Sequence, residues 1–172
     1  MKCSLTLRLK GALLLSVLSA APAFAQSAPT VAGTHGDWTV YTRGSGNARI
    51  CYVLSEAQTE SPSNVNHGDI YFMVSNWKSG AATEQPSFLA GYSLKTTRAP
   101  KAQVGSTALT MFAADNEAFI SDSSDERKLV AKMRAGSTMT VSAVSQRGTQ
   151  TRYSFSLKGV TAALRQAKSA CS

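Results

Sequence analysis

The chain has 172 residues and a formal net charge of +8, from 18 lysines and arginines against 10 aspartates and glutamates. This length suits one domain of ordinary size. The positive charge disfavours basic partners and tolerates anionic ones, but the lack of a dense Lys/Arg patch argues against nucleic-acid binding.

The first 25 residues have the pattern of a secretory signal peptide. Basic residues lie within 1–10, an apolar run covers 11–21, and a small-x-small pattern at 23–25 predicts cleavage after Ala25. The apolar run is shorter than the roughly 20 residues that span a bilayer, so it does not predict a membrane anchor. We therefore expect an exported protein, periplasmic or secreted, whose mature chain has no transmembrane segment and a net charge of +5.

Residues 26–34 are rich in Ala, Ser, Pro and Thr and predict a flexible lead before a single domain over 35–172. Within that domain, short runs of β-branched and aromatic residues alternate with turn residues. The runs fall at 37–42, 49–55, 70–77, 87–94, 107–113, 117–121, 138–146 and 149–158. Eight short strands at this spacing predict a mainly β protein, an antiparallel β-sandwich of immunoglobulin-like type.

Side-chain alternation indicates how two of these strands lie in their sheets. Thr151, Tyr153 and Phe155 share one face of the last strand while polar residues occupy the other, which is typical of a sheet with one solvated face. The run 70–77 is largely apolar on both faces, so we expect it to be a central strand.

Two short helices interrupt the strands. Ser123 and Glu126 form a capping box at the start of the first, and Gly136 can end it. The second covers residues 160–171, at the C-terminus. Its apolar residues recur on one face, which predicts docking on a sheet: Val160, Ala163, Leu164, Ala167 and Cys171.

The cysteines suggest one disulfide. Cys3 falls within the predicted signal peptide, which leaves Cys51 and Cys171 in an exported chain. Cys171 continues the apolar face of the C-terminal helix and so points inward, as a bridge to a strand cysteine requires. The alternative is two free buried thiols.

The candidate catalytic groups are few. The tripeptide His-Gly-Asp occurs twice, beginning at His35 and at His67, and a His and an Asp so close together could share a metal or a proton. No HExxH, no CxxC and no third ligand lies nearby in the sequence, and turn formation before a strand explains both tripeptides. No Gly-x-Ser-x-Gly elbow is present. The sequence therefore predicts a non-enzymatic protein without cofactor or metal.

Trp77 is the candidate for partner contact. It lies at the end of a predicted strand, where the chain enters a long polar loop. An exposed indole there could stack on a sugar or anchor a partner protein. The alternative is a half-buried tryptophan of the core.

Segments over nearly all of the mature chain resemble the invasion-associated locus B family of exported bacterial proteins. The N-terminal and middle segments are Gly36-Asp37-Trp38-Thr39-Val40, Cys51-Tyr52-Val53-Leu54-Ser55-Glu56, Tyr71-Phe72-Met73-Val74-Ser75 and Gly91-Tyr92. The C-terminal segments are the most specific: Leu129–Ser137, Met139-Thr140-Val141, Ser145-Gln146-Arg147-Gly148-Thr149, Phe155–Gly159, Ala162-Ala163-Leu164 and Cys171.

The resemblance implies a small periplasmic or extracellular β-sandwich, a link to host-cell interaction or entry for some members, and no known enzymatic reaction. Two positions depart from the family. Tyr41-Thr42 stands where many members have a further cysteine, and Tyr153 where an acidic residue is common.

The leading hypothesis is thus an exported envelope or host-cell interaction module. Its partner would be a protein, a glycan or an anionic envelope component. One alternative is a small periplasmic hydrolase or metal-dependent enzyme that uses His35 and His67. Another is an inhibitor of an exported enzyme, although the positive charge argues against a basic target.

Overall fold

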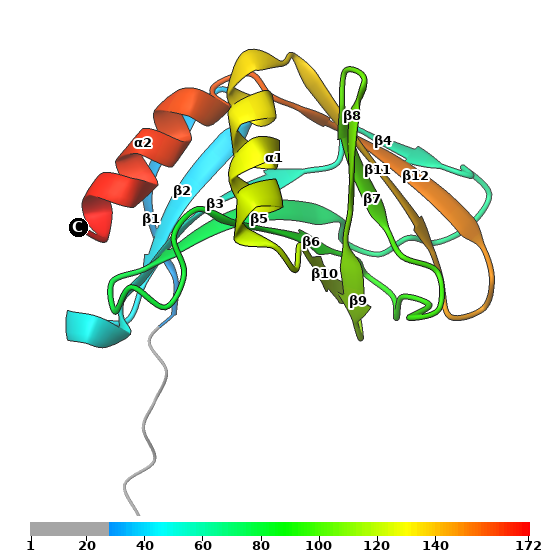
Figure 1. The fold of residues 1–172 in the computed structure, drawn as a ribbon, viewed down its shortest axis with the longest axis horizontal. Coiled ribbons are helices and arrows are strands. Elements are labelled where there is room, and N and C mark those ends of the chain that lie inside the picture. The colour runs from blue at the N-terminus through cyan, green and yellow to red at the C-terminus, as the bar shows by residue number, and fades with distance from the viewer. Residues whose placement is uncertain (1–27) are drawn as a thin grey trace, which may run out of the picture.

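The structure, a computed structural model, describes residues 28–172 (Figure 1). The predicted signal peptide and its cleavage point after Ala25 lie outside the described residues. The described chain forms two antiparallel sheets and two α-helices. The prediction of a mainly β sandwich with two short helices, one of them C-terminal, is confirmed.

The larger sheet has seven strands. Their order across the sheet is β1 (Thr30–His35), β2 (Trp38–Arg43), β3 (Ile50–Glu56), β5 (Tyr71–Trp77), β6 (Gln85–Leu89), β10 (Glu117–Phe119) and β9 (Phe112–Ala114). A single 3₁₀ turn, Gly46–Ala48, lies between β2 and β3. β5 has a neighbour on each side, β3 and β6, which confirms that the run 70–77 is a central strand.

The smaller sheet has five strands. Their order is β4 (Thr59–Ser61), β12 (Gln150–Ser156), β11 (Thr138–Val144), β7 (Lys101–Val104) and β8 (Thr107–Thr110). On β12 the predicted alternation is observed, since Thr151, Tyr153 and Phe155 are buried. Aromatic contacts join the two sheets: the ring centroids of Phe72 and Phe155 are 5.8 Å apart, and those of Phe88 and Tyr153 5.5 Å.

The prediction of a flexible lead over 26–34 is wrong from Thr30 onward. Residues 30–35 form β1, in which Val31 is paired with Tyr41 of β2. The composition of this segment gives no strand signal. The backbone groups of residues 30–35 nevertheless form hydrogen bonds with β2, and this pairing decides the conformation of the segment.

The run 107–113, which the sequence predicts to be one strand, forms parts of two strands. It divides at Met111, which is 1% exposed, into β8 of the smaller sheet and β9 of the larger one. A buried side chain at the crossover lets one short segment pair with β7 on one side and with β10 on the other. β4 and β7, both short, were not predicted.

The N-cap of the first helix, α1 (Ser123–Ala135), is one residue earlier than the sequence predicts. Its N-cap is Asp122, whose carboxylate accepts hydrogen bonds from the backbone N–H of Ser124 and of Asp125. The capping box of Ser123 and Glu126 is therefore a wrong prediction. Asp122, and not Ser123, caps the helix because an ionised carboxylate accepts hydrogen bonds more strongly than a hydroxyl at a helix N-terminus. Gly136 is the C-cap, as expected.

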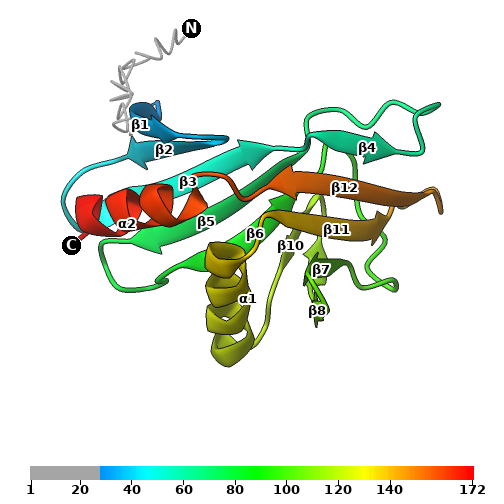
Figure 2. The ribbon, with the colours of Figure 1, turned by 90° about the horizontal axis from the view of Figure 1, so that it is seen from above.

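The second helix, α2 (Val160–Ala170), lies on the inner face of the larger sheet, along β2, β3 and β5 (Figure 2). The predicted apolar stripe is buried, and Cys171 at its C-cap forms a disulfide with Cys51 of β3. The two Cα atoms are 5.8 Å apart, so the predicted bridge is confirmed.

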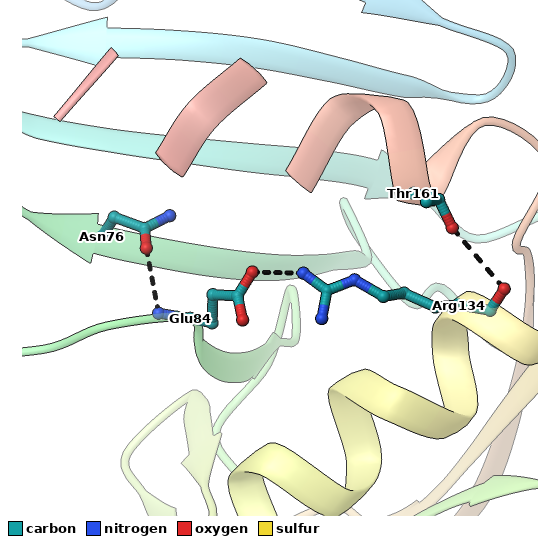
Figure 3. A network of polar contacts seen from close by, with 4 residues as sticks. All are labelled: Asn76, Glu84, Arg134 and Thr161. Carbon is teal, nitrogen blue, oxygen red and sulfur yellow. Dashed lines mark hydrogen bonds and ion pairs between the residues drawn. The ribbon is translucent and has the colours of Figure 1, made fainter. Parts of the chain in front are cut away.

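Polar contacts join α1 to the loop between β5 and β6 and to α2 (Figure 3). Arg134 of α1 forms an ion pair with Glu84, and the backbone N–H of Glu84 donates to Asn76 Oδ1 at 3.0 Å. The backbone carbonyl of Arg134 accepts a long hydrogen bond, 3.5 Å, from the Thr161 hydroxyl of α2. Within residues 28–172, no helix is long and apolar enough to cross a membrane.

Candidate functional site

The outer face of the larger sheet carries several apolar and aromatic side chains. Successive side chains of a strand point to opposite faces of the sheet. On β3, Cys51 and Val53 point inward and are fully buried, so Tyr52 and Leu54 point outward, where both are half-buried. Since α2 is bonded to Cys51, it lies on the inner face and leaves the outer one open.

The same alternation brings apolar side chains from six strands onto this face, which we call the outer aromatic face. Its members are Tyr41, Tyr52, Leu54, Tyr71, Met73, Trp77, Leu89, Phe112 and Phe119. Figure 1 shows both helices and the smaller sheet on the opposite side of the larger sheet. Among the described residues, no element packs over the outer aromatic face.

Cross-strand pairs join several of these side chains. Tyr41 lies directly opposite Tyr52, and their rings stack with centroids 5.3 Å apart and planes 16° apart. Leu54 lies opposite Met73 in the next pair of strands. At the far edge, Phe112 lies opposite Phe119 with ring centroids 5.8 Å apart. Such pairs stabilise a sheet, and they form apolar patches on a face that also carries Ser75, Ser87 and Glu117.

Trp77 lies on the outer aromatic face, opposite Ile50, and is 41% exposed. The structure therefore places the predicted contact residue at the surface, at the end of β5. Trp38, by contrast, is fully buried and donates from Nε1 to the Ser156 carbonyl at 2.9 Å.

The phenols of Tyr52 and Tyr71 are held in their neutral form. Burial raises the pKa of Tyr52, and the neighbouring Tyr41 raises it further against the opposing effect of Arg43. Burial also raises the pKa of Tyr71, with added contributions from Asp69 and Glu56. Their hydroxyl groups are thus available as uncharged hydrogen-bonding groups beside an apolar surface.

His35 lies at the end of β1, next to α2. Its Nε2 is 2.6 Å from Gln166 Oε1. The following residue, Gly36, has a positive φ of 56° and directs the chain into β2. This geometry confirms the turn interpretation of the first His-Gly-Asp tripeptide.

His67 is 5% exposed, and both of its ring nitrogens have partners. Nε2 donates to the Pro62 carbonyl at 2.9 Å, and Nδ1 is 2.8 Å from the Tyr153 hydroxyl. Gly68 has a φ of 64°, and its backbone N–H donates to Asn66 Oδ1 at 2.9 Å. Within the described part of the chain, no three His, Cys, Asp or Glu side chains are grouped so that they could hold a metal ion.

Sequence reasoning missed most of the outer aromatic face. The signal was present, because 49–55 and 70–77 carry apolar residues on both faces. For 70–77 that pattern predicts only a central strand, and for 49–55 the sequence predicts a strand without assigned faces. To tell a buried sheet face from an exposed one, it is necessary to know that both helices and the smaller sheet pack on the same side of the larger sheet.

These features define a class of small two-sheet β proteins with a disulfide-anchored C-terminal helix and one open, aromatic sheet face. The family model for the Invasion associated locus B (IalB) protein matches residues 38–168. The chain belongs to this family, as the resemblance in sequence predicts.

A solved structure shares the fold. It is the crystal structure of invasion associated protein B from Bartonella henselae, which is 14% identical in sequence and superposes with a TM-score of 0.57. The match covers 84% of this chain and 97% of the Bartonella chain. Among proteins with curated descriptions, none matches this sequence significantly.

Proposed function

We propose that this protein is an exported, non-enzymatic binding module whose outer aromatic face docks a partner protein of the envelope or of a host-cell surface. The observation that carries the proposal is the set of aromatic and aliphatic side chains on that face, with Trp77 and Phe112 41% and 47% exposed. Contiguous exposed apolar patches on soluble domains mark interaction sites, and Tyr, Trp, Phe and Met are enriched at interfaces. IalB family membership supports export.

A protein partner suits this face better than a glycan. Stacking on a sugar needs an open ring face, but Tyr41 and Tyr52 each have one face covered by the other. The apolar side chains also extend across most of the sheet, from β2 to β9, which is wider than a site for one sugar ring. A broad sheet face with polar phenol tips matches the apolar centre and polar rim of protein interfaces.

Site-directed photo-crosslinking tests the proposal. A photoreactive residue is placed at Met73, in the middle of the outer aromatic face, and as a matched control at Arg152, an exposed position of the smaller sheet. The oxidised chain over residues 26–172 is exposed to envelope fractions and to host-cell surface extracts. We expect one partner protein to be crosslinked from position 73 and not from position 152.

The purified partner then gives an affinity. We expect Trp77→Ala and Tyr52→Ser each to weaken binding at least tenfold with an unchanged circular dichroism spectrum, since a few aromatic anchors carry most of an interface. Chelator and His35→Ala should leave binding unchanged. Equal crosslinking from both positions, self-association through position 73, or loss of binding with chelator would each overturn the proposal.

A further inference from the structure

A second site lies between the two sheets, away from the outer aromatic face. A cavity of about 440 Å³, partly open to solvent, is bordered by the loop before β5, the segment after β6 and the β11–β12 hairpin. Hydrogen bonds hold the last two walls together, because the Gln146 N–H donates to the Ser93 carbonyl and the Lys95 N–H to the Val144 carbonyl, both at 2.8 Å. The volume is in the range of small-ligand sites, roughly 300–1,000 Å³.

Two glycines bring the first two walls into contact. A Cβ built on Gly91 would lie 2.4 Å from the His67 carbonyl oxygen and 2.6 Å from Gly68 Cα. This close backbone approach fixes His67 beside Tyr92, and both side chains line the cavity. The cavity is therefore built by specific backbone packing and is not a gap between loosely placed loops.

A chain of polar side chains forms one wall. The Tyr153 hydroxyl is 2.8 Å from His67 Nδ1 and 2.8 Å from the Tyr92 hydroxyl, which in turn is 2.7 Å from Thr151 Oγ1. Burial raises the pKa of Tyr153 far above its ordinary value, and the bond to Tyr92 raises it further, so the phenol stays neutral. Thr151 Oγ1 is also 3.3 Å from the Ala143 carbonyl.

The Tyr153 hydroxyl donates to the Tyr92 hydroxyl, and the Thr151 hydroxyl donates to the Ala143 carbonyl. The Tyr92 hydroxyl is therefore left to donate to Thr151 Oγ1. The protons of Tyr92 and Thr151 are thus used within the chain. Toward the cavity these two hydroxyls can therefore only accept, and they suit ligand groups that donate.

Other residues of the lining supply hydrogen-bond donors and positive charge. Arg147 and the side-chain amides of Asn66 and Gln146 offer donors, and no aspartate or glutamate lines the cavity. Within residues 28–172, Arg147 makes no ion pair with a carboxylate. Asp115 accepts a hydrogen bond from Ser93 at 3.0 Å but is not part of the lining. A guanidinium with two amides is suited to bind a carboxylate.

We propose that this cavity binds a small carboxylate that also carries hydroxyl groups, of the chemical class of the acidic sugars. Arg147 binds the carboxylate, and the Tyr92 and Thr151 oxygens accept from the ligand hydroxyls. Both groups of residues are needed to specify this class. A neutral sugar has no carboxylate for Arg147 to bind, and a simple carboxylate has no hydroxyl groups to donate to Tyr92 and Thr151.

Titration of the isotope-labelled, oxidised chain over residues 26–172, followed by NMR, tests this site. The probe is galacturonate, and galactose is its neutral counterpart with the same ring. We expect saturable shifts of the backbone amides of Tyr92 and Arg147 with galacturonate, and at least tenfold weaker binding of galactose.

Two variants and one control locate the binding. Arg147→Gln should weaken galacturonate binding at least tenfold, and Tyr92→Phe severalfold, while Arg127→Gln removes the same charge from the exposed side of α1 and should change nothing. Arg147 lies on an exposed hairpin, so its loss should not impair folding. Absence of saturable shifts, equal affinity for galactose, or unchanged binding by Arg147→Gln would each overturn the proposal.

Discussion

At the scale of single residues, glycines explain the repeated His-Gly-Asp tripeptide better than chemistry does. Gly36 packs so closely that a Cβ would lie 2.4 Å from the Lys158 carbonyl oxygen, and one on Gly159 would lie 2.0 Å from that of His35. Gly68 packs against Gly91 in the same manner. In each tripeptide the glycine thus permits close contact with a distant backbone segment.

Gly159→Ala tests this packing. The native φ of Gly159 is 90°, so alanine meets both backbone strain and the His35 carbonyl. Strain of this kind costs about 1–3 kcal/mol, and we expect a loss of unfolding free energy at the upper end or above it. The control is Gly148→Ala, which has a φ of 94° but no atom within 4 Å of the added Cβ. Urea denaturation measures both, and equal losses would contradict the close-packing explanation.

At the scale of elements, the start of α1 depends on one carboxylate. Asp122 accepts from the Ser124 hydroxyl and from two backbone N–H groups, and these hydrogen bonds lower its pKa. The interactions form only in the folded helix. The stabilisation that they provide must therefore depend on pH.

The sign follows from the lowered pKa. The contribution of Asp122 is fully present above the unfolded value, about pH 4, and is lost as pH falls through the lower folded value. We expect Asp122→Asn to lower Tm at neutral pH and to flatten its decline in acid. Ser124→Ala should weaken the same dependence partly. A wild-type acid decline in Asp122→Asn, measured by thermal unfolding from pH 2 to 7, would contradict this role.

At the scale of the whole molecule, one disulfide joins the middle of the larger sheet to the C-terminus. It closes a loop with a sequence separation of 120 residues. The same bridge holds α2 on the inner face, which leaves the outer aromatic face open. Fold stability and the position of the proposed binding surface therefore depend on the same covalent link.

Removal of the disulfide should lower the free energy of unfolding by about 2–5 kcal/mol, as is typical of bridges in small exported domains. Urea denaturation of wild type and of the Cys51→Ala/Cys171→Ala variant measures the loss. Reductant should shift the wild-type midpoint toward that of the variant and leave the variant unaffected. An unchanged wild-type midpoint after complete reduction would show that the bridge does not stabilise the fold.

Local patterns determined much of this protein. The period of two along 149–158, the two helices and the inward-pointing Cys171 all follow from side chains a few residues apart, and the structure has each of them. The position of Trp77 at a strand end was also predicted, but its exposure was left open between a partner contact and a half-buried core residue. The physical reason is that alternation, capping and helix faces are set by neighbouring residues.

Only the tertiary structure decided the rest. The pairing of β1, the division at Met111, the open aromatic face and the cavity beside His67 all depend on segments far apart in the sequence. Tyr153 shows the difference. Its burial follows from strand alternation, but its hydrogen bonds to His67 and Tyr92 exist only because three separate segments meet. Local periodicity encodes which way a side chain points, whereas long-range packing selects what it meets.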